Sequence, residues 1–241
     1  MENRTKLGMN RTGMQMAPFE GPQQVEHAQD APAEPMLGRQ TLAQERGRYI
    51  QEADRLGSVP LPGTVKGVMQ ATLGKLQGKA PEVLFDKLGQ RLAFERTGTR
   101  LYEAAAAKAD AAEPPVEPQL CADLWRICEQ EKEHFLLLKA AMESLGGDPT
   151  AQTPCAASSA VASMGLLQVV TDPRTTVNQC LEALLTAELT DEAGWALLAQ
   201  VARHAGHGDL ADSFEKPMAQ EEEHMQTIER WLTQRVLAET S

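Results

Sequence analysis

Two short segments of the sequence carry the residues best suited to chemistry, and they read EKEH at 131–134 and EEEH at 221–224. On an α-helix, residues three positions apart share a face, so the first glutamate and the histidine of each segment can reach the same metal ion. Carboxylate oxygens and imidazole nitrogens are common ligands of transition metals. The sequence therefore predicts two metal-binding pairs, Glu131 with His134 and Glu221 with His224.

Each pair is preceded by a single glutamate at a similar distance. Glu95 lies 36 positions before Glu131, and Glu188 lies 33 positions before Glu221. This separation fits one helix, a turn and half of a returning helix. Leucines three and seven positions before Glu95 place it on an apolar stripe, which argues against a solvated side chain. The ligand order Glu, Glu-x-x-His, Glu, Glu-x-x-His then spans four helices.

The six side chains favour a particular kind of metal. Four carboxylates balance two divalent ions, and oxygen donors with two nitrogens suit iron or manganese better than structural zinc. We expect two iron ions, or two manganese ions, as the cofactors. Glu131 and Glu221 are expected to bridge the ions, with Glu95 and Glu188 as terminal ligands. Coordination positions then stay open for dioxygen or hydrogen peroxide.

Two further residues are expected to act on these ligands. Tyr102, two turns after Glu95, is predicted to project toward the site, where it hydrogen-bonds a ligand carboxylate or takes part in radical chemistry. Asp191, one turn after Glu188, is predicted to orient a histidine ring. The two halves of the chain also match by offset, with Glu95, Thr97 and Tyr102 corresponding to Glu188, Thr190 and Trp195. Such a repeat predicts two helix hairpins related by an approximate two-fold axis.

The helices that must position these residues are predicted from apolar stripes and from proline and glycine. They run from Pro81 to about 107, from about 118 to 145, from near Asp172-Pro173 to just before Gly206, and from about Asp209 onward. Residues 150–175 are too many for a tight turn and too mixed for a long helix. We expect an overhead connection there, with at most a short helix over 160–170. Pro217, one turn before Glu221, is predicted to kink or split the last helix.

The region before the bundle is predicted to be less ordered. Residues 1–40 are polar and predict a disordered tail. Residues 41–80 predict short helices and a proline-rich linker, including a helix that ends near Gly57 and a small basic amphipathic helix over 64–78. For the latter we expect packing on the acidic bundle or on a second subunit rather than on lipid. The bundle itself is predicted over 81–238.

Composition restricts the partners and the compartment. The net charge of −11 argues against nucleic acid and anionic lipid as partners. No stretch reaches the ~20 apolar residues of a membrane span, and the start lacks the apolar run of a secretory signal. The four cysteines form no Cys-x-x-Cys pair, which favours reduced thiols. We expect a cytoplasmic protein, with a homodimer as a possible assembly.

At the two Glu-x-x-His pairs and their upstream glutamates, the sequence resembles the ferritin-like superfamily and, more loosely, the rubrerythrin and bacterial ferritin-like di-iron proteins. The resemblance covers about 81–238 and implies an all-α, ferritin-like four-helix bundle with one long crossover connection. It also implies ferroxidase, peroxidase, catalase or oxygenase chemistry. The chain departs from rubrerythrins because it lacks the paired Cys-x-x-Cys motifs of a rubredoxin module. It departs from cage-forming ferritins because both Glu-x-x-His pairs are complete.

Three functions remain open from the sequence. The first is a di-metal oxidoreductase that reacts with dioxygen or hydrogen peroxide, for example in oxidative-stress defence. The second is a non-catalytic protein that binds and sequesters iron. The third is a bundle with a vestigial site that acts as an interaction module through the 64–78 helix.

Overall fold

The computed structural model describes residues 12–13, 16–30, 37–62, 64, 67–68 and 80–240. The chain divides into two compact units, one within Thr5–Leu56 and a larger one that contains Gly57–Ser241. Helices α1 (Glu20–Asp30) and α2 (Leu37–Glu52) belong to the smaller unit. The predicted helix before Gly57 is therefore present as α2, whereas α1 forms inside the segment predicted to be a disordered tail. The predicted 64–78 helix lies almost entirely outside the described residues.

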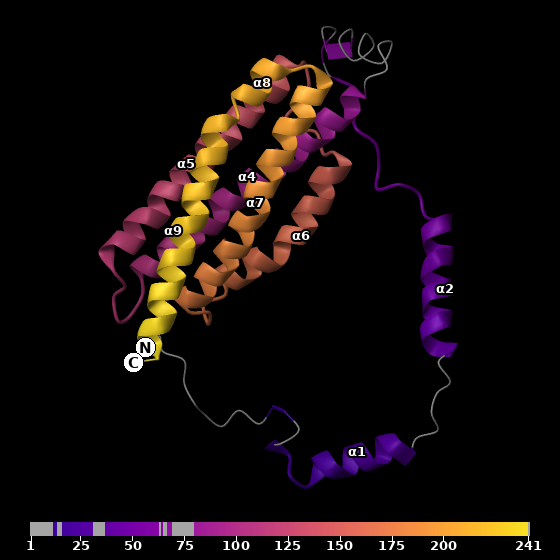
Figure 1. Ribbon diagram of the computed structural model, residues 1–241, viewed down its shortest axis with the longest axis vertical. Helices are drawn as coiled ribbons and strands as arrows, with labels where there is room; N and C mark the ends of the chain where they lie inside the picture. The colour runs from indigo at the N-terminus through magenta and orange to yellow at the C-terminus, as the bar shows by residue number, and fades with distance from the viewer. Residues whose placement is uncertain are drawn as a thin grey trace. The chain divides into compact units, whose positions relative to one another are not determined.

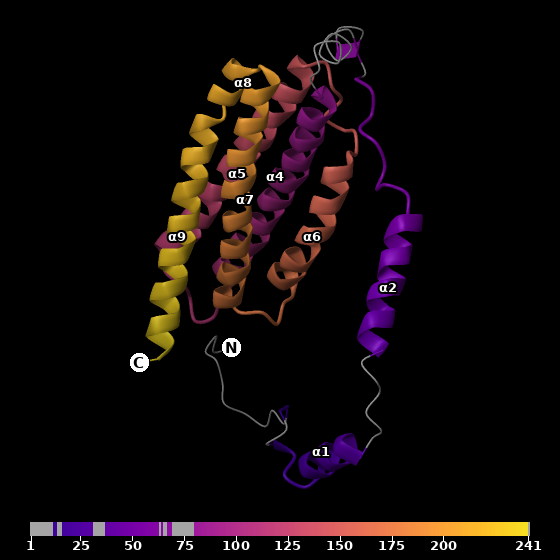
Figure 2. The same ribbon diagram turned by 45° about the vertical axis from the view of Figure 1, so that its right-hand side comes forward.

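Four long helices form the bundle: α4 (Pro81–Asp110), α5 (Pro118–Ser144), α7 (Val177–Ala205) and α9 (Glu215–Glu239). Helix α4 packs against α5 and α7, and α9 packs against α7 and α5. Both ribbon views show the four helices side by side, with the short helix α8 (Gly208–Asp212) at the turn between α7 and α9 (Figure 1, Figure 2). The predicted all-α four-helix bundle is confirmed.

The long connection between α5 and α7 is itself a helix, α6 (Pro154–Thr171). It packs against α4 and α7 and runs along the bundle, so α5 and α7 point in the same direction (Figure 1). This is the single crossover expected of a ferritin-like bundle. The prediction of a mixed segment with at most a short helix over 160–170 was wrong. Thr153 caps α6 by accepting a hydrogen bond from the Ala156 N–H, and Pro154 suits its first turn.

Two predicted helix starts are also corrected. Helix α7 begins at Val177 instead of near Asp172, because Thr176 and Gln179 form a reciprocal capping box. The last predicted helix is split, as expected, but the break lies between Asp212 and Glu215. Pro217 falls in the first turn of α9, where no intrahelical bond needs its missing N–H. Helix α9 is therefore uninterrupted through the second Glu-x-x-His pair.

Two apolar clusters fill the bundle on either side of its middle. One includes Leu101, Ile127, Leu181, Ile228 and Trp231. The other includes Leu88, Leu138, Leu198, Ala211 and Phe214. On every long helix the predicted metal ligands lie between these two sets of residues. The fold therefore holds a polar layer in the centre of an otherwise apolar core, at the depth where unpaired charge is most costly.

Helix α6 is the most apolar helix of the described part of the chain. It is the one described helix that is long and apolar enough to cross a membrane by length and composition, and 22% of its 18 residues are buried. Several of its large side chains are exposed, including Val161 and Met164. Its other side packs on α4 and α7, which gives its apolar residues a place in the bundle.

Candidate metal centre

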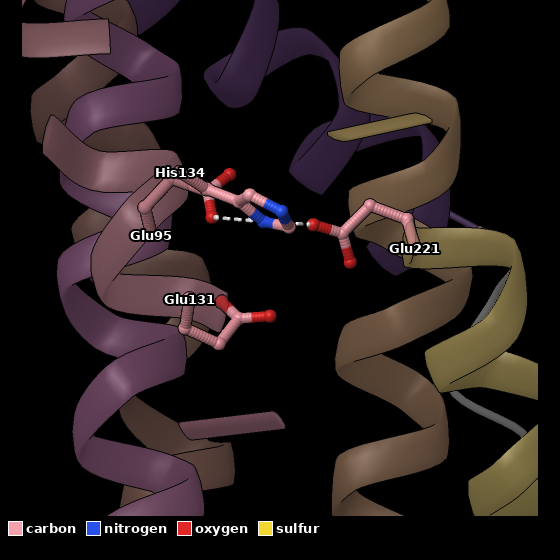
Figure 3. A group of neighbouring side chains, drawn as sticks. All are labelled: Glu95, Glu131, His134 and Glu221. Atoms are coloured by element: carbon pink, nitrogen blue, oxygen red, sulfur yellow. Dashed lines mark ion pairs between the residues drawn. The ribbon is translucent and has the colours of Figure 1, made fainter. Parts of the chain in front are cut away.

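The structure brings all six predicted ligands together in the middle of the bundle. Each of the four long helices contributes: α4 gives Glu95, α5 gives Glu131 and His134, α7 gives Glu188, and α9 gives Glu221 and His224. None of the six exposes more than 2% of its surface. Figure 3 shows four of them, Glu95, Glu131, His134 and Glu221, pointing toward one another from three helices.

The six residues form two overlapping groups, each with the size of a single ion site. Glu95, Glu131, His134 and Glu221 make the first group, and Glu131, Glu188, Glu221 and His224 make the second. Within each group, one ligand atom from every residue lies within 4.8 Å of the others. Glu131 and Glu221 belong to both groups. They therefore occupy the positions that carboxylates bridging two ions would need.

Both histidines present Nδ1 to the carboxylates. His134 Nδ1 lies 2.7 Å from Glu221 Oε1 and 3.7 Å from Glu95 Oε2. His224 Nδ1 lies 3.2 Å from Glu221 Oε2, 3.4 Å from Glu131 Oε1 and 3.8 Å from Glu188 Oε2. Nδ1 is therefore the atom of each ring that can bind a metal.

The other ring nitrogen of each histidine, Nε2, is held by a glutamine. The sequence reasoning missed both glutamines. Nε2 of His134 lies 3.1 Å from Gln220 Oε1, and Nε2 of His224 lies 3.0 Å from Gln130 Oε1. An amide oxygen only accepts, so each Nε2 carries the proton and each Nδ1 is left free for a ligand role. The signal was present, because both segments read Q-E-x-E-H from the glutamine onward. Each glutamine braces the histidine of the other hairpin.

The aromatic residues at matching positions also reach across the bundle. Tyr102 of α4 donates a hydrogen bond to Glu188 Oε1 of α7, as predicted for a ligand carboxylate, and its ring lies 6.5 Å from that of His224. Trp195 of α7 packs edge-on against His134 of α5 at 5.7 Å between ring centroids. The predicted repeat therefore has a structural counterpart, with Tyr102 and Trp195 on opposite sides of the centre.

The predicted role of Asp191 is wrong. Its carboxylate accepts a hydrogen bond from Arg91, and the same Nη2 atom also donates to Glu95. Arg91 and Asp191 are both buried, at 3% and 2% exposure. Asp191 therefore neutralises an arginine that contacts a candidate ligand, and it does not orient a histidine. The sequence reasoning also missed Arg91, although it lies one helical turn before Glu95.

Electrostatics in this layer favour cations. The Arg91 and Asp191 charges cancel, so the four glutamates leave a charge of −4 when ionised. Burial, followed by the neighbouring Glu221 and Glu95 carboxylates, raises the pKa of Glu131 well above its ordinary value. Burial and the carboxylates of Glu131 and Glu221 do the same to the pKa of Glu188. Without cations, the site therefore holds protons on these carboxyl groups.

The pKa values of His134 and Glu221 are shifted by ion pairing across the site. Burial acts to lower the pKa of His134, but the Glu221 and Glu95 carboxylates raise it to about 11. Burial acts to raise the pKa of Glu221, but hydrogen bonds from His134 and His224 lower it to about 2. His134 therefore carries a proton at the position where a metal ion would lie beside Glu221.

The donor set fits a dinuclear metal centre. Four buried carboxylate oxygens have no hydrogen-bond partner, and they are Glu95 Oε2, Glu131 Oε1 and Oε2, and Glu188 Oε2. Buried polar atoms rarely stay unpaired, so their convergence indicates ligands that a cation would satisfy. Gly98 of α4 makes room for them, because a Cβ atom at this position would collide with Oε2 of Glu131.

Replacing Gly98 by alanine should displace the Glu131 carboxylate. We expect at least about a tenfold loss of metal affinity, the size of effect seen when ligand positioning is disturbed. Gly165→Ala is the matched control, since Gly165 also lies in a helix and a Cβ there meets nothing within 4 Å. It should leave metal binding unchanged and stabilise the protein by up to about 1 kcal/mol. Metal titration of both variants measures this, and equal affinities would show that Glu131 needs no such space.

Comparison with known proteins gives one solved structure to set beside this centre. No family model matches the chain, and no curated protein matches it. The chain is similar to one of the ferritin-like, diiron-carboxylate proteins from Bacillus anthracis str. Ames, with 23% sequence identity and a TM-score of 0.49. The match covers 62% of this chain and 94% of that chain.

Proposed function

We propose that the protein is an oxidoreductase with a dinuclear non-haem centre of iron or manganese, and that it reacts with dioxygen or hydrogen peroxide. The observation that carries this proposal is the convergence of four carboxylates and two Nδ1 atoms, with four unpartnered carboxylate oxygens among them. Oxygen donors with two imidazole nitrogens suit iron and manganese. When bound, such a metal supplies one-electron redox chemistry with oxygen species.

The residues around the ligands have separate tasks in this proposal. Gln130 and Gln220 keep the protons on the outer ring nitrogens and so aim each Nδ1 inward. The two apolar clusters exclude bulk water from the charged layer, which strengthens every interaction within it. Glu131 and Glu221 belong to both groups of ligands, so each would help to hold both ions.

Tyr102 is the residue that we propose to take part in the reaction itself. Burial, followed by the Glu188 and Glu131 carboxylates, raises its pKa well above its ordinary value, so its hydroxyl stays protonated. That proton is shared with Glu188, a candidate ligand. Tyr102 can therefore pass its proton to Glu188 Oε1 through this hydrogen bond.

Metal analysis combined with turnover tests this function. Protein from cells supplied with both iron and manganese should hold about two metal ions per chain, and it should turn over hydrogen peroxide or oxidise Fe(II). Tyr102→Phe should keep the metal content but slow turnover by about tenfold or more, within the usual range for a proton-transfer group. Tyr49→Phe is the control, because Tyr49 is the other tyrosine of the chain and lies exposed on α2.

Three outcomes would contradict the proposal or a part of it. Metal-replete protein that is inert toward peroxide, dioxygen and Fe(II) would contradict the proposed oxidoreductase activity. Iron bound far above two ions per chain, in a large assembly, would instead indicate the sequestering protein that the sequence left open. Equal turnover of the Tyr102→Phe and Tyr49→Phe variants would remove Tyr102 from the reaction.

A further inference from the structure

A groove between α4, α6 and α7 lies beside the metal centre but contains none of the six candidate ligands. Its volume is about 520 Å³, within the range of sites for small organic molecules. Arg91 lies at its floor and is 3% exposed, whereas Ala162 and Leu197 on its walls are exposed. The groove therefore leads from the surface to a buried arginine that contacts Glu95.

The charged residues that line the groove are cationic. Arg91 lies at the floor, and Lys87 on the same face of α4 donates a hydrogen bond to Gln90 Oε1 at 3.0 Å. None of the lining residues, all of which belong to the described part of the chain, is an aspartate or a glutamate. Asp191 and Glu95 pair with Arg91 from behind the lining, but within the lining itself the only charges are positive, which favours an anionic ligand.

Arg91 still has a donor to offer such a ligand. Its Nη2 serves Glu95 and Asp191, but its Nε is buried and has no hydrogen-bond partner. The guanidinium also lies over two aromatic rings, 4.9 Å from the centroid of Phe94 and 5.5 Å from that of Trp195. A buried donor left unpaired is costly, so an acceptor from outside the chain that reached Arg91 would be favoured.

The rest of the lining defines the other end of the ligand. The hydroxyl groups of Ser158, Ser163, Thr186 and Thr190 donate to backbone carbonyls of their own helices. These four hydroxyl groups are therefore already engaged, and Arg91 and Lys87 are the charged donors of the lining. Phe94, Leu166 and Leu197 supply apolar contacts. A ligand that matches both features has an anionic head and a short apolar body.

We propose that this groove binds a small organic carboxylic acid, with the carboxylate on Arg91 and the apolar body along α6. The coupling that follows rests on the proposed function. Without metal, the Arg91 charge is shared by Glu95 and Asp191. A cation at the centre draws negative charge from Glu95 and leaves more of the arginine's charge for the ligand. Metal and acid therefore bind with positive coupling, and each strengthens the other by the same factor.

Calorimetric titration with hexanoate tests the proposal on metal-loaded and on chelator-treated full-length protein. We expect hexanoate to bind the metal-loaded protein at least about fivefold more tightly, at the lower end of known coupling factors. Hexan-1-ol is the matched probe without the charge, and it should bind much more weakly. The optical spectrum of the metal-loaded protein should also shift with hexanoate, because Arg91 contacts a candidate ligand.

Two alanines of α6 give a matched pair of variants. Ala162 lines the groove and Ala160 does not, and both are exposed. Ala162→Trp should fill the groove and weaken hexanoate binding by about tenfold or more, equivalent to about 1.4 kcal/mol. Ala160→Trp should bind hexanoate as the parent protein does. Both substitutions are at the surface, so both variants should fold.

Each outcome separates the groove from the metal chemistry. If the protein binds metal but not hexanoate, or if both tryptophan variants lose hexanoate affinity equally, the groove is not a carboxylic acid site. The proposed oxidoreductase is unaffected by that result. Hexanoate binding in a protein that takes up no metal supports the groove and overturns the metal centre. Equal hexanoate affinity with and without metal supports the groove and overturns the coupling through Arg91.

Discussion

Replacing Arg91 by leucine should destabilise the folded protein by about 3–5 kcal/mol, the cost of removing one partner from a buried ion pair. The change leaves the Asp191 carboxylate buried without its cation and removes a donor from Glu95. Leucine itself fits this kind of position, because Leu184 lies four residues before Glu188 just as Arg91 lies four residues before Glu95. The loss should therefore come from charge and not from shape. Urea denaturation measures it.

A second variant separates the charge from the packing. The double variant Arg91→Leu/Asp191→Ala also removes the carboxylate that Arg91→Leu leaves buried without a partner. We therefore expect it to regain at least half of the stability that the single variant loses. The double-mutant cycle gives the coupling between the two side chains directly. If the double variant is as unstable as the sum of the single variants, the ion pair is not what makes Arg91 important.

The six candidate ligands could be predicted from the sequence because their surroundings restrict them strongly. Glu95 lies on a stripe with Leu88 and Leu92, and a carboxylate at such a position must meet a positive charge somewhere. Two Glu-x-x-His pairs with similar upstream spacing then predict where the ligands meet. The same stripes predict the four long helices, whose cores are the two apolar clusters found in the structure.

The arginine and the aspartate could not be placed by the same reasoning. Arg91 and Glu95 are four residues apart, which on an exposed helix is an ordinary surface pair. Only the packing of α4 against α7 brings Asp191 to Arg91, and this packing depends on Gly194, where a Cβ atom would collide with the guanidinium. A contact between residues 100 positions apart has no local signal in the sequence.

Helix α6 shows a different limit. Its start carries a clear signal in Thr153 and Pro154, a capping threonine followed by a proline in the first turn. Its body lacks the alternation of apolar and polar faces that predicts a surface helix, because small apolar residues occur all around it. The groove at its side, lined in part by Ala162 and Leu166, depends on where α6 packs, which its sequence does not determine.

Removal of the metal should make the stability of the protein depend on pH in an unusual direction. The folded pKa values of Glu131 and Glu188 lie well above their ordinary value of 4.5, and that of His134 rises from 6.5 to about 11. In each case the folded protein holds a proton that the unfolded chain releases. Stability from these groups is therefore complete below the ordinary pKa and is lost as the pH rises toward the folded value.

We expect chelator-treated protein to lose stability from about pH 5 to about pH 8, by about 1.4 kcal/mol per pH unit for each proton that only the folded state holds. Glu221, whose pKa is lowered to about 2, has the opposite effect, but only below 4.5. Metal-loaded protein should gain stability over the same range, because metal ions compete with protons for these ligands.

Urea denaturation across this range, with and without chelator, compares the two slopes of stability against pH. Glu131→Gln removes one of the titrating groups and should flatten the slope of the chelated protein. Parallel slopes with and without metal would mean that these carboxylates and the ions do not share a site, and the proposed centre would then have to be abandoned.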